Sequence, residues 1–145
     1  MTQHETDEHR KLQRDTFDRL EPIWKVRIWE TQLFSPLDAI AVRLEPDGTT
    51  GIIKAVIEHK AREEHYQQPW LLVRKYMHLL IAADTLKVTP LYVLRYPTPA
   101  EIWFIDVRDI PKPVISVMGG RPSRPEQPHE PMIVFPHSAM KKVKL

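Results

Sequence analysis

The spacing of hydrophobic residues changes several times along the chain, and each change marks an element. Residues 4–20 carry apolar side chains at helical spacing between charged ones, which predicts an amphipathic helix that ends at Pro22. From Ile23 to Trp29 apolar and polar residues alternate, which is typical of a strand. Two further runs, Asp38–Leu44 and Ile52–Glu58, are separated by turn residues and predict an antiparallel hairpin.

Prolines mark the elements in the second half of the chain. Pro69–Leu86 has helical periodicity, and Pro69 suits the first helical position, where an amide hydrogen is not needed. Val88–Tyr96 and Ile102–Val107 are rich in β-branched and aromatic residues and are expected to be strands. The helix is expected to pack on a sheet through one apolar face, which consists of Trp70, Val73, Met77, Leu80 and Ile81.

After Ile110 two short apolar runs flank a proline-rich polar loop. Val114–Met118 and Met132–Phe135 are expected to be short strands of one hairpin, with residues 119–131 as the loop between them. The tail, Ser138–Leu145, is expected either to form a short helix or to fray.

These elements predict an α+β fold in which helices flank a mixed central β-sheet. A chain of 145 residues is long enough for one domain with a proper core. Residues 1–110 are expected to form that core, and residues 111–145 to add a C-terminal hairpin, an arm and a basic tail to the same domain.

The composition argues against a disulfide-bonded, secreted or membrane-spanning protein. The chain has no cysteine, which excludes disulfides and thiolate catalysis and fits a cytoplasmic protein. Its first residues are polar, unlike a secretory signal, and its longest apolar run is far shorter than the ~20 residues of a membrane helix. The net charge of +2 permits nucleic-acid binding without arguing for it.

Acidic residues stand at the ends of the first predicted hairpin. Asp38 begins one strand and Glu58 ends its antiparallel partner, so their carboxylates are expected to lie across from each other at one edge of the sheet. Mg²⁺ binds one or two protein carboxylates and keeps waters that a phosphate can displace. Both residues are therefore candidate Mg²⁺ ligands, with Mn²⁺ as a substitute; ordinary strand-end ion pairs are the alternative.

Two neighbouring residues extend this candidate site. Because side chains alternate along a strand, Lys60 shares a face with Glu58, while His59 points to the other face. The Lys60 ammonium is suited to orienting an attacking water or offsetting negative charge on phosphorus. The backbone carbonyl of His59 is a candidate third ligand, and its ring needs a hydrogen-bond partner if it enters the core.

This placement resembles the pattern of the PD-(D/E)XK nuclease superfamily, in which an aspartate begins one strand and Glu-x-Lys lies on the next. Pro36-Leu37-Asp38 and Glu58-His59-Lys60 match it, with one residue inserted after the proline and a histidine where an apolar residue is usual. The resemblance covers roughly residues 20–140 and is greatest to small phage-encoded members with a Holliday-junction-resolvase or RecB-nuclease-like core. Further matching positions are Ala61-Arg62, Tyr66, Lys75, Gly119-Gly120-Arg121, Arg124, Glu130-Pro131 and Pro136.

The resemblance implies a restriction-endonuclease-like core and a Mg²⁺-dependent DNA endonuclease, encoded by a phage and acting in the host cytoplasm. Asp38, Glu58 and Lys60 would be its catalytic residues. Members often add an acid from the first helix, and the candidates here are Glu5, Glu8, Asp15, Glu21 and Glu30.

Basic residues elsewhere are candidate contacts to DNA phosphates, because Arg and Lys supply most such contacts; simple solvation is the alternative. Residues 119–131 are suited to closing on DNA, to forming a hairpin tip or to serving as a dimerisation arm. A chain with one site cuts one strand, so cleavage of both strands would need a homodimer. The candidate DNA contacts are Arg62, Lys75, Arg121 and Arg124.

Two other functions fit the same sequence. One is a nucleic-acid-binding protein that keeps the fold without cutting, which predicts metal-independent binding with a steep salt dependence. The other is a phage accessory protein that binds a host protein through residues 119–131. The sequence leaves open whether the substrate is duplex, single-stranded or branched DNA, or RNA.

Overall fold

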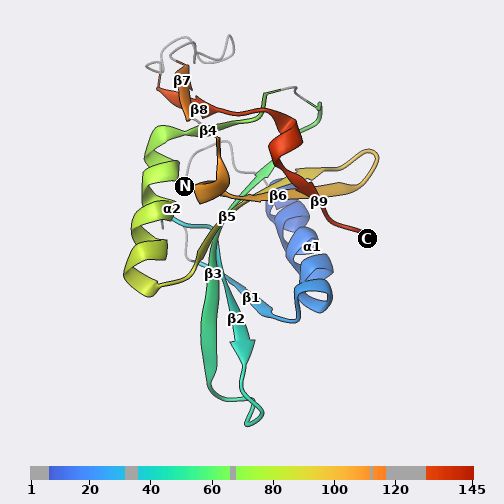
Figure 1. Ribbon diagram of the computed structural model, residues 1–145. Coiled ribbons are helices and arrows are strands. Elements are labelled where there is room, and N and C mark those ends of the chain that lie inside the picture. Colours follow the sequence, from blue (N-terminus) through green and yellow to red (C-terminus); the bar gives the residue numbers. More distant parts are fainter. Residues whose placement is uncertain (1–6, 32–35, 66–67, 112, 117–129) are drawn as a thin grey trace.

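The computed structural model describes residues 7–31, 36–65, 68–111, 113–116 and 130–145 (Figure 1). No helix within these ranges is long and apolar enough to span a membrane. The helices are α1 (Asp7–Trp24), α2 (Val73–Leu86) and two short 3₁₀ helices, η1 (Val107–Asp109) and η2 (His137–Ala139).

The larger sheet has six strands in the order β1-β2-β3-β5-β6-β9. β3 and β5 run parallel, and every other neighbouring pair is antiparallel. α2 lies in the crossover between the parallel strands, because a parallel pair cannot be joined by a hairpin. The fold is therefore α+β with a mixed sheet, as predicted. Its strands are β1 (Arg27–Glu30), β2 (Ala39–Leu44), β3 (Gly51–Ala61), β5 (Thr89–Tyr96), β6 (Glu101–Asp106) and β9 (Lys141–Lys142).

The two long helices lie on opposite sides of this sheet (Figure 1). Phe17 of α1 is fully buried in one apolar cluster together with Ile57 of β3. Leu79 of α2 is fully buried in a second cluster together with Val56 of β3. Because side chains alternate along a strand, odd-numbered residues of this part of β3 face α1 and even-numbered residues face α2.

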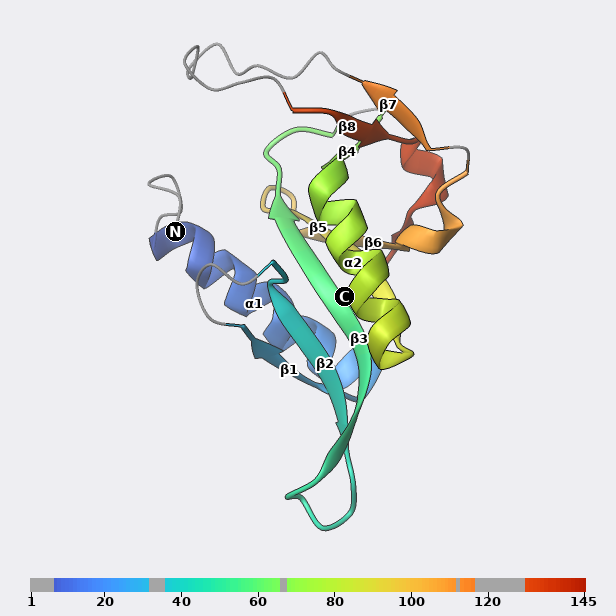
Figure 2. The ribbon, with the colours of Figure 1, turned by 90° about the vertical axis from the view of Figure 1, so that its left-hand side faces the viewer.

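A smaller sheet of three antiparallel strands has the order β4-β8-β7. The hydroxyl of Tyr92 in β5 donates to the carbonyl of Trp70 at 2.9 Å, which links the two sheets. Figure 2 shows the small sheet at one end of the molecule and the tip of the β2–β3 hairpin extending beyond both helices at the other. The strands are β4 (Trp70–Leu72), β7 (Val114–Ser116) and β8 (Met132–Val134).

The structure corrects the predicted end of the first helix. α1 continues through Pro22 to Trp24, and the chain turns at Lys25, whose φ is 56°. A proline in the last turn removes one helical hydrogen bond, and Trp24 packs edge-on against Phe104 with ring centroids 5.3 Å apart. The strand predicted from Ile23 therefore begins only at residue 27.

The predicted start of the second helix is also wrong. Trp70–Leu72 pair with β8 as a strand, and α2 begins at Val73. Its buried face is rotated from the predicted one: Leu79 is buried, while Met77 and Ile81 are 52% and 59% exposed. Pairing with a strand more than fifty residues later overrides the local preference.

The hairpin predicted after Ile110 is confirmed as β7 and β8, which pair antiparallel. The tail after it does not fray, and the predicted short helix is found only at its start, in the 3₁₀ helix η2. Lys141 and Lys142 pair with β6 as an edge strand, and Val143 is 6% exposed in the cluster beneath α1.

Candidate active site

The register of β2 and β3 brings Asp38 and Glu58 together. Ala39 pairs with Ile57, so the residue before Ala39 lies opposite the residue after Ile57 across the antiparallel pair. The amide of Asp38 donates to the carbonyl of Ile57 at 3.0 Å, which continues the pairing. Glu58 is an even-numbered residue of β3, so both carboxylates are on the face that α2 covers.

Glu58 is held in an environment that opposes its charge. The residue is 6% exposed, and burial, followed by the nearby charge of Asp38, raises its pKa to about 8. Lys75 and Lys60 act in the opposite direction. The Lys75 ammonium lies 3.4 Å from Glu58 Oε1, close enough for an ion pair. Oε1 nevertheless has no hydrogen-bond partner among the described residues.

Asp38 is fixed by the backbone of β3. Its Oδ2 accepts a hydrogen bond of 2.7 Å from the amide of His59. A bond of this length to an ionised carboxylate is among the stronger kinds. The residue between Glu58 and Lys60 therefore also positions Asp38.

The site carries two cationic side chains from different elements. Lys60 is half-buried on β3, two residues beyond Glu58 and on the same face. Lys75, one of the predicted DNA contacts, comes from the first turns of α2 and lies beside Glu58. The structure thus brings together the three predicted catalytic residues and adds Lys75 to them.

The donor set fits a hard divalent cation. Two neighbouring carboxylates, one with a buried oxygen that lacks a hydrogen-bond partner, are the ligands that Mg²⁺ uses in proteins. Within the described ranges, no group of three or more His, Cys, Asp or Glu side chains surrounds a common point. Further ligands would therefore come from backbone or water, and the carbonyl of His59 stays a prediction.

The His59 ring lies on the opposite face of the sheet, as predicted, and has the partner that burial demands. Its Nε2 is 3.2 Å from the hydroxyl of Thr16 in α1, and its ring packs edge-on against Phe17. Burial, followed by the charge of Arg95, lowers the pKa of His59 to about 3, so the ring is neutral. Sequence reasoning missed Thr16 and Arg95; the signal was a histidine inside an apolar strand.

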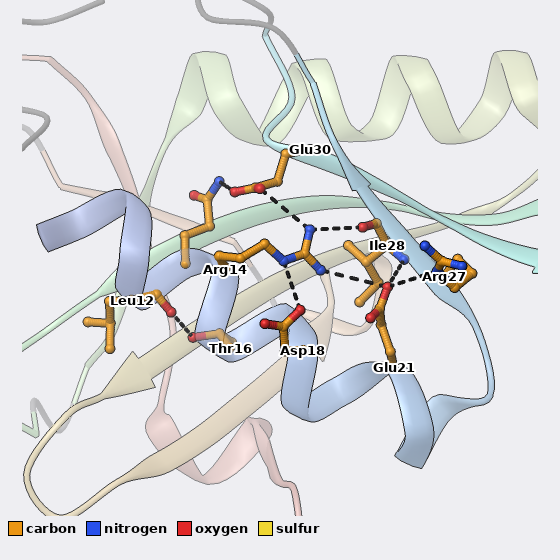
Figure 3. A network of polar contacts seen from close by, with 9 residues as sticks. Leu12, Arg14, Thr16, Asp18, Glu21, Arg27, Ile28 and Glu30 are labelled. Carbon is orange, nitrogen blue, oxygen red and sulfur yellow. Dashed lines mark hydrogen bonds and ion pairs between the residues drawn. The ribbon is translucent and has the colours of Figure 1, made fainter. Parts of the chain in front are cut away.

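The acids of α1 and β1 are engaged on that opposite face. Arg14 lies 3.7 Å from Glu21 and 3.4 Å from Glu30, and Figure 3 shows all three side chains in one network. Asp15 binds Arg95 at 2.7 Å. Asp15, Glu21 and Glu30 therefore make their contacts away from the candidate site. Glu8 is exposed at the start of α1, and Glu5 lies outside the described residues.

Of the other predicted DNA contacts, only Arg62 lies among the described residues. The Arg62 guanidinium lies 4.3 Å from the centre of the Trp70 ring, which indicates a cation–π contact with the small sheet. Arg121, Arg124 and Tyr66 lie outside the described residues.

Comparisons with known proteins bear on the fold. No protein-family model and no curated protein matches the sequence. Among solved structures, the chain is similar to Hjc, a Holliday junction resolvase from the archaeal hyperthermophile Archaeoglobus fulgidus, with a TM-score of 0.52 and 19% sequence identity. The match covers 89% of this chain and 86% of that chain. The predicted restriction-endonuclease-like fold is therefore confirmed, because the chain shares its fold with this resolvase.

Proposed function

We propose that the chain is a Mg²⁺-dependent DNA endonuclease, with Mn²⁺ as a substitute metal. The observation that carries the proposal is the buried Glu58 carboxylate, which lies across from Asp38 on β2 and β3 and whose Oε1 has no hydrogen-bond partner among the described residues. Its support is the position of Lys60 on the same face and the shared fold with a Holliday junction resolvase. Origin in a phage and action in the host cytoplasm belong to the same proposal.

Asp38 and Glu58 would hold the cation, and the chain's own contacts prepare them for it. The His59 amide fixes Asp38, and the ammonium of Lys75 favours the ionised form of Glu58 against burial. When bound, the cation would supply a charge that polarises the phosphate and activates water. Lys60 then orients the attacking water and offsets the negative charge that grows on phosphorus.

The test is a cleavage assay with Mg²⁺ on duplex, single-stranded and branched DNA and on RNA. Glu58→Gln and Lys60→Ala are each expected to abolish cleavage, because they remove a ligand and the catalytic cation. Lys54→Ala is the matched control, because Lys54 is an exposed lysine of the same strand, six residues and about 20 Å from Lys60. Cleavage by both site variants would refute the proposal.

The same assay separates the two rival functions. A protein that binds nucleic acid without cutting would bind DNA equally well in EDTA and Mg²⁺, with a steep salt dependence. A phage accessory protein would lose a host partner when residues 119–131 are deleted and would keep its affinity for DNA. Cleavage of both strands would require a homodimer, which sedimentation of the chain with its DNA tests directly.

A further inference from the structure

A buried polar network lies behind the candidate site, on the face of the sheet that α1 covers. Its members are the hydroxyl of Thr16, the ring of His59 and the guanidinium of Arg95, which are 0%, 7% and 4% exposed. The hydroxyl lies 3.2 Å from His59 Nε2 and 3.2 Å from Arg95 Nη1. These contacts join α1 to the two parallel strands at the centre of the sheet.

The short contact between Thr16 and Leu12 favours one assignment of the hydrogen bonds in this network. The Thr16 hydroxyl donates to the carbonyl of Leu12 at 2.8 Å, a bond that Figure 3 shows within α1. Its oxygen then has only acceptor capacity left, and Arg95 can only donate. His59 must therefore carry a hydrogen on Nε2 and donate it to Thr16. Both acceptor positions of the hydroxyl are filled, so the ring is held in one orientation.

The network is a costly way to attach a helix to a sheet. Arg95 is buried, its Nε has no hydrogen-bond partner among the described residues, and its Nη1 also binds Asp15 at 2.7 Å. Apolar side chains at all three positions would fill the core without burying these groups, and replacing a whole buried polar network by apolar residues is often neutral or stabilising. What the network adds is a defined orientation.

His59, whose ring the network orients, also positions a carboxylate of the candidate site through its backbone. The backbone amide of His59 donates to Asp38 Oδ2 at 2.7 Å, and its chain neighbours are Glu58 and Lys60. A movement of the His59 ring within α1's packing would therefore shift the amide that fixes Asp38. We propose that Thr16, His59 and Arg95 are positioning residues that hold the Asp38 carboxylate against Glu58 from behind and so set the affinity of the site for a divalent cation.

This inference rests on the proposed metal site, and Thr16 offers a matched pair of variants to test it. Thr16→Val keeps the shape and removes the hydroxyl, whereas Thr16→Ser keeps the hydroxyl. The amide proton of His59 in the metal-free protein reports the bond to Asp38 by NMR, and titration with Mg²⁺ gives the dissociation constant. Thr16→Val is expected to move the amide signal upfield and to weaken Mg²⁺ binding about tenfold or more, as losses behind a metal ligand do. Thr16→Ser is expected to behave like the unaltered chain.

The two readouts need no DNA, so they separate this inference from the proposed nuclease. If the unaltered chain binds Mg²⁺ but cuts no nucleic acid, the nuclease fails and the variants still decide the inference. If it binds no Mg²⁺, the proposed site fails and the His59 amide signal alone decides whether the network positions Asp38. The inference is overturned if Thr16→Val changes neither the amide signal of His59 nor the affinity for Mg²⁺. Should Thr16→Val fail to fold, ring ¹⁵N shifts of the unaltered protein decide: a hydrogen on Nδ1 of His59 instead of Nε2 overturns it.

Discussion

Replacing Glu58 with glutamine is expected to stabilise the metal-free protein at alkaline pH. The folded chain raises the pKa of this carboxyl from 4.5 to about 8, so the folded state binds a proton that the unfolded state has released. Stability is therefore greatest below the unfolded value and falls as pH rises toward 8, where the buried carboxyl ionises. At about 1.4 kcal/mol per pH unit, the loss is on the order of 3 kcal/mol at pH 7 and 5 kcal/mol above pH 8.

Glutamine has the same shape and no ionisation, so Glu58→Gln removes this pH dependence. A buried amide without partners costs about 1–3 kcal/mol itself, which leaves a net gain of roughly 2–4 kcal/mol above pH 8. Urea unfolding in EDTA from pH 5 to pH 9 measures the two curves. Glu58→Gln is expected to be equally or less stable than the unaltered chain near pH 5 and more stable above pH 8, whereas Glu63→Gln, at an exposed position, should follow the unaltered chain throughout.

Mg²⁺ is expected to reverse the order of stability. A ligand that binds only the folded state stabilises it by about 4.1 kcal/mol at a concentration one thousand times its dissociation constant. The unaltered chain should gain this at pH 8, and Glu58→Gln should not. Parallel curves for the two proteins from pH 5 to pH 9 in EDTA would show that Glu58 is not a buried, disfavoured carboxylate, and the reasoning about the site would fall.

Three further outcomes follow from the described contacts. Burial lowers the pKa of His59 to about 3, so its contribution to stability is present above about 6.5 and lost as pH falls below it; His59→Gln should flatten this acid limb in urea unfolding from pH 4 to pH 7. Arg62→Gln should cost about 0.5–1 kcal/mol and change the fluorescence of Trp70, whose ring Arg62 covers. Val143→Ala should cost about 2 kcal/mol in thermal unfolding if β9 closes the core beneath α1, and nothing if the tail frays.

The sequence predicted those parts of the fold that local patterns determine. The β2–β3 hairpin follows from two alternating runs with turn residues between them, and its register alone brings Asp38 opposite Glu58. The start of α2 could not be found in this way. Trp70–Leu72 have helical periodicity, but their hydrogen bonds go to Met132–Val134, a partner that no local window contains.

In the candidate site, too, the sequence predicts the residues that are adjacent along one strand and misses those that packing brings together. Glu58, His59 and Lys60 are adjacent in sequence, so alternation assigns each to a face of the sheet. Thr16 reaches His59 across 43 positions of the sequence and Arg95 across 79, through the packing of α1 on the sheet. A histidine in an apolar strand predicts a hydrogen-bond partner, but only the packed structure identifies that partner.

The charges of the site explain why it carries two lysines. With Glu58 protonated or ionised, the pair of carboxylates is balanced or exceeded by the ammonium groups of Lys60 and Lys75 in the absence of a cation. Addition of Mg²⁺ leaves a net positive site when both carboxylates are ionised. A negative phosphodiester is then attracted more strongly to the loaded site than to the unloaded one, and in the unloaded site the lysines compensate the buried carboxylates. Because burial disfavours the Glu58 carboxylate in the metal-free protein, the cation must displace a proton from it below about pH 8, and the affinity for the cation is expected to rise with pH up to that value.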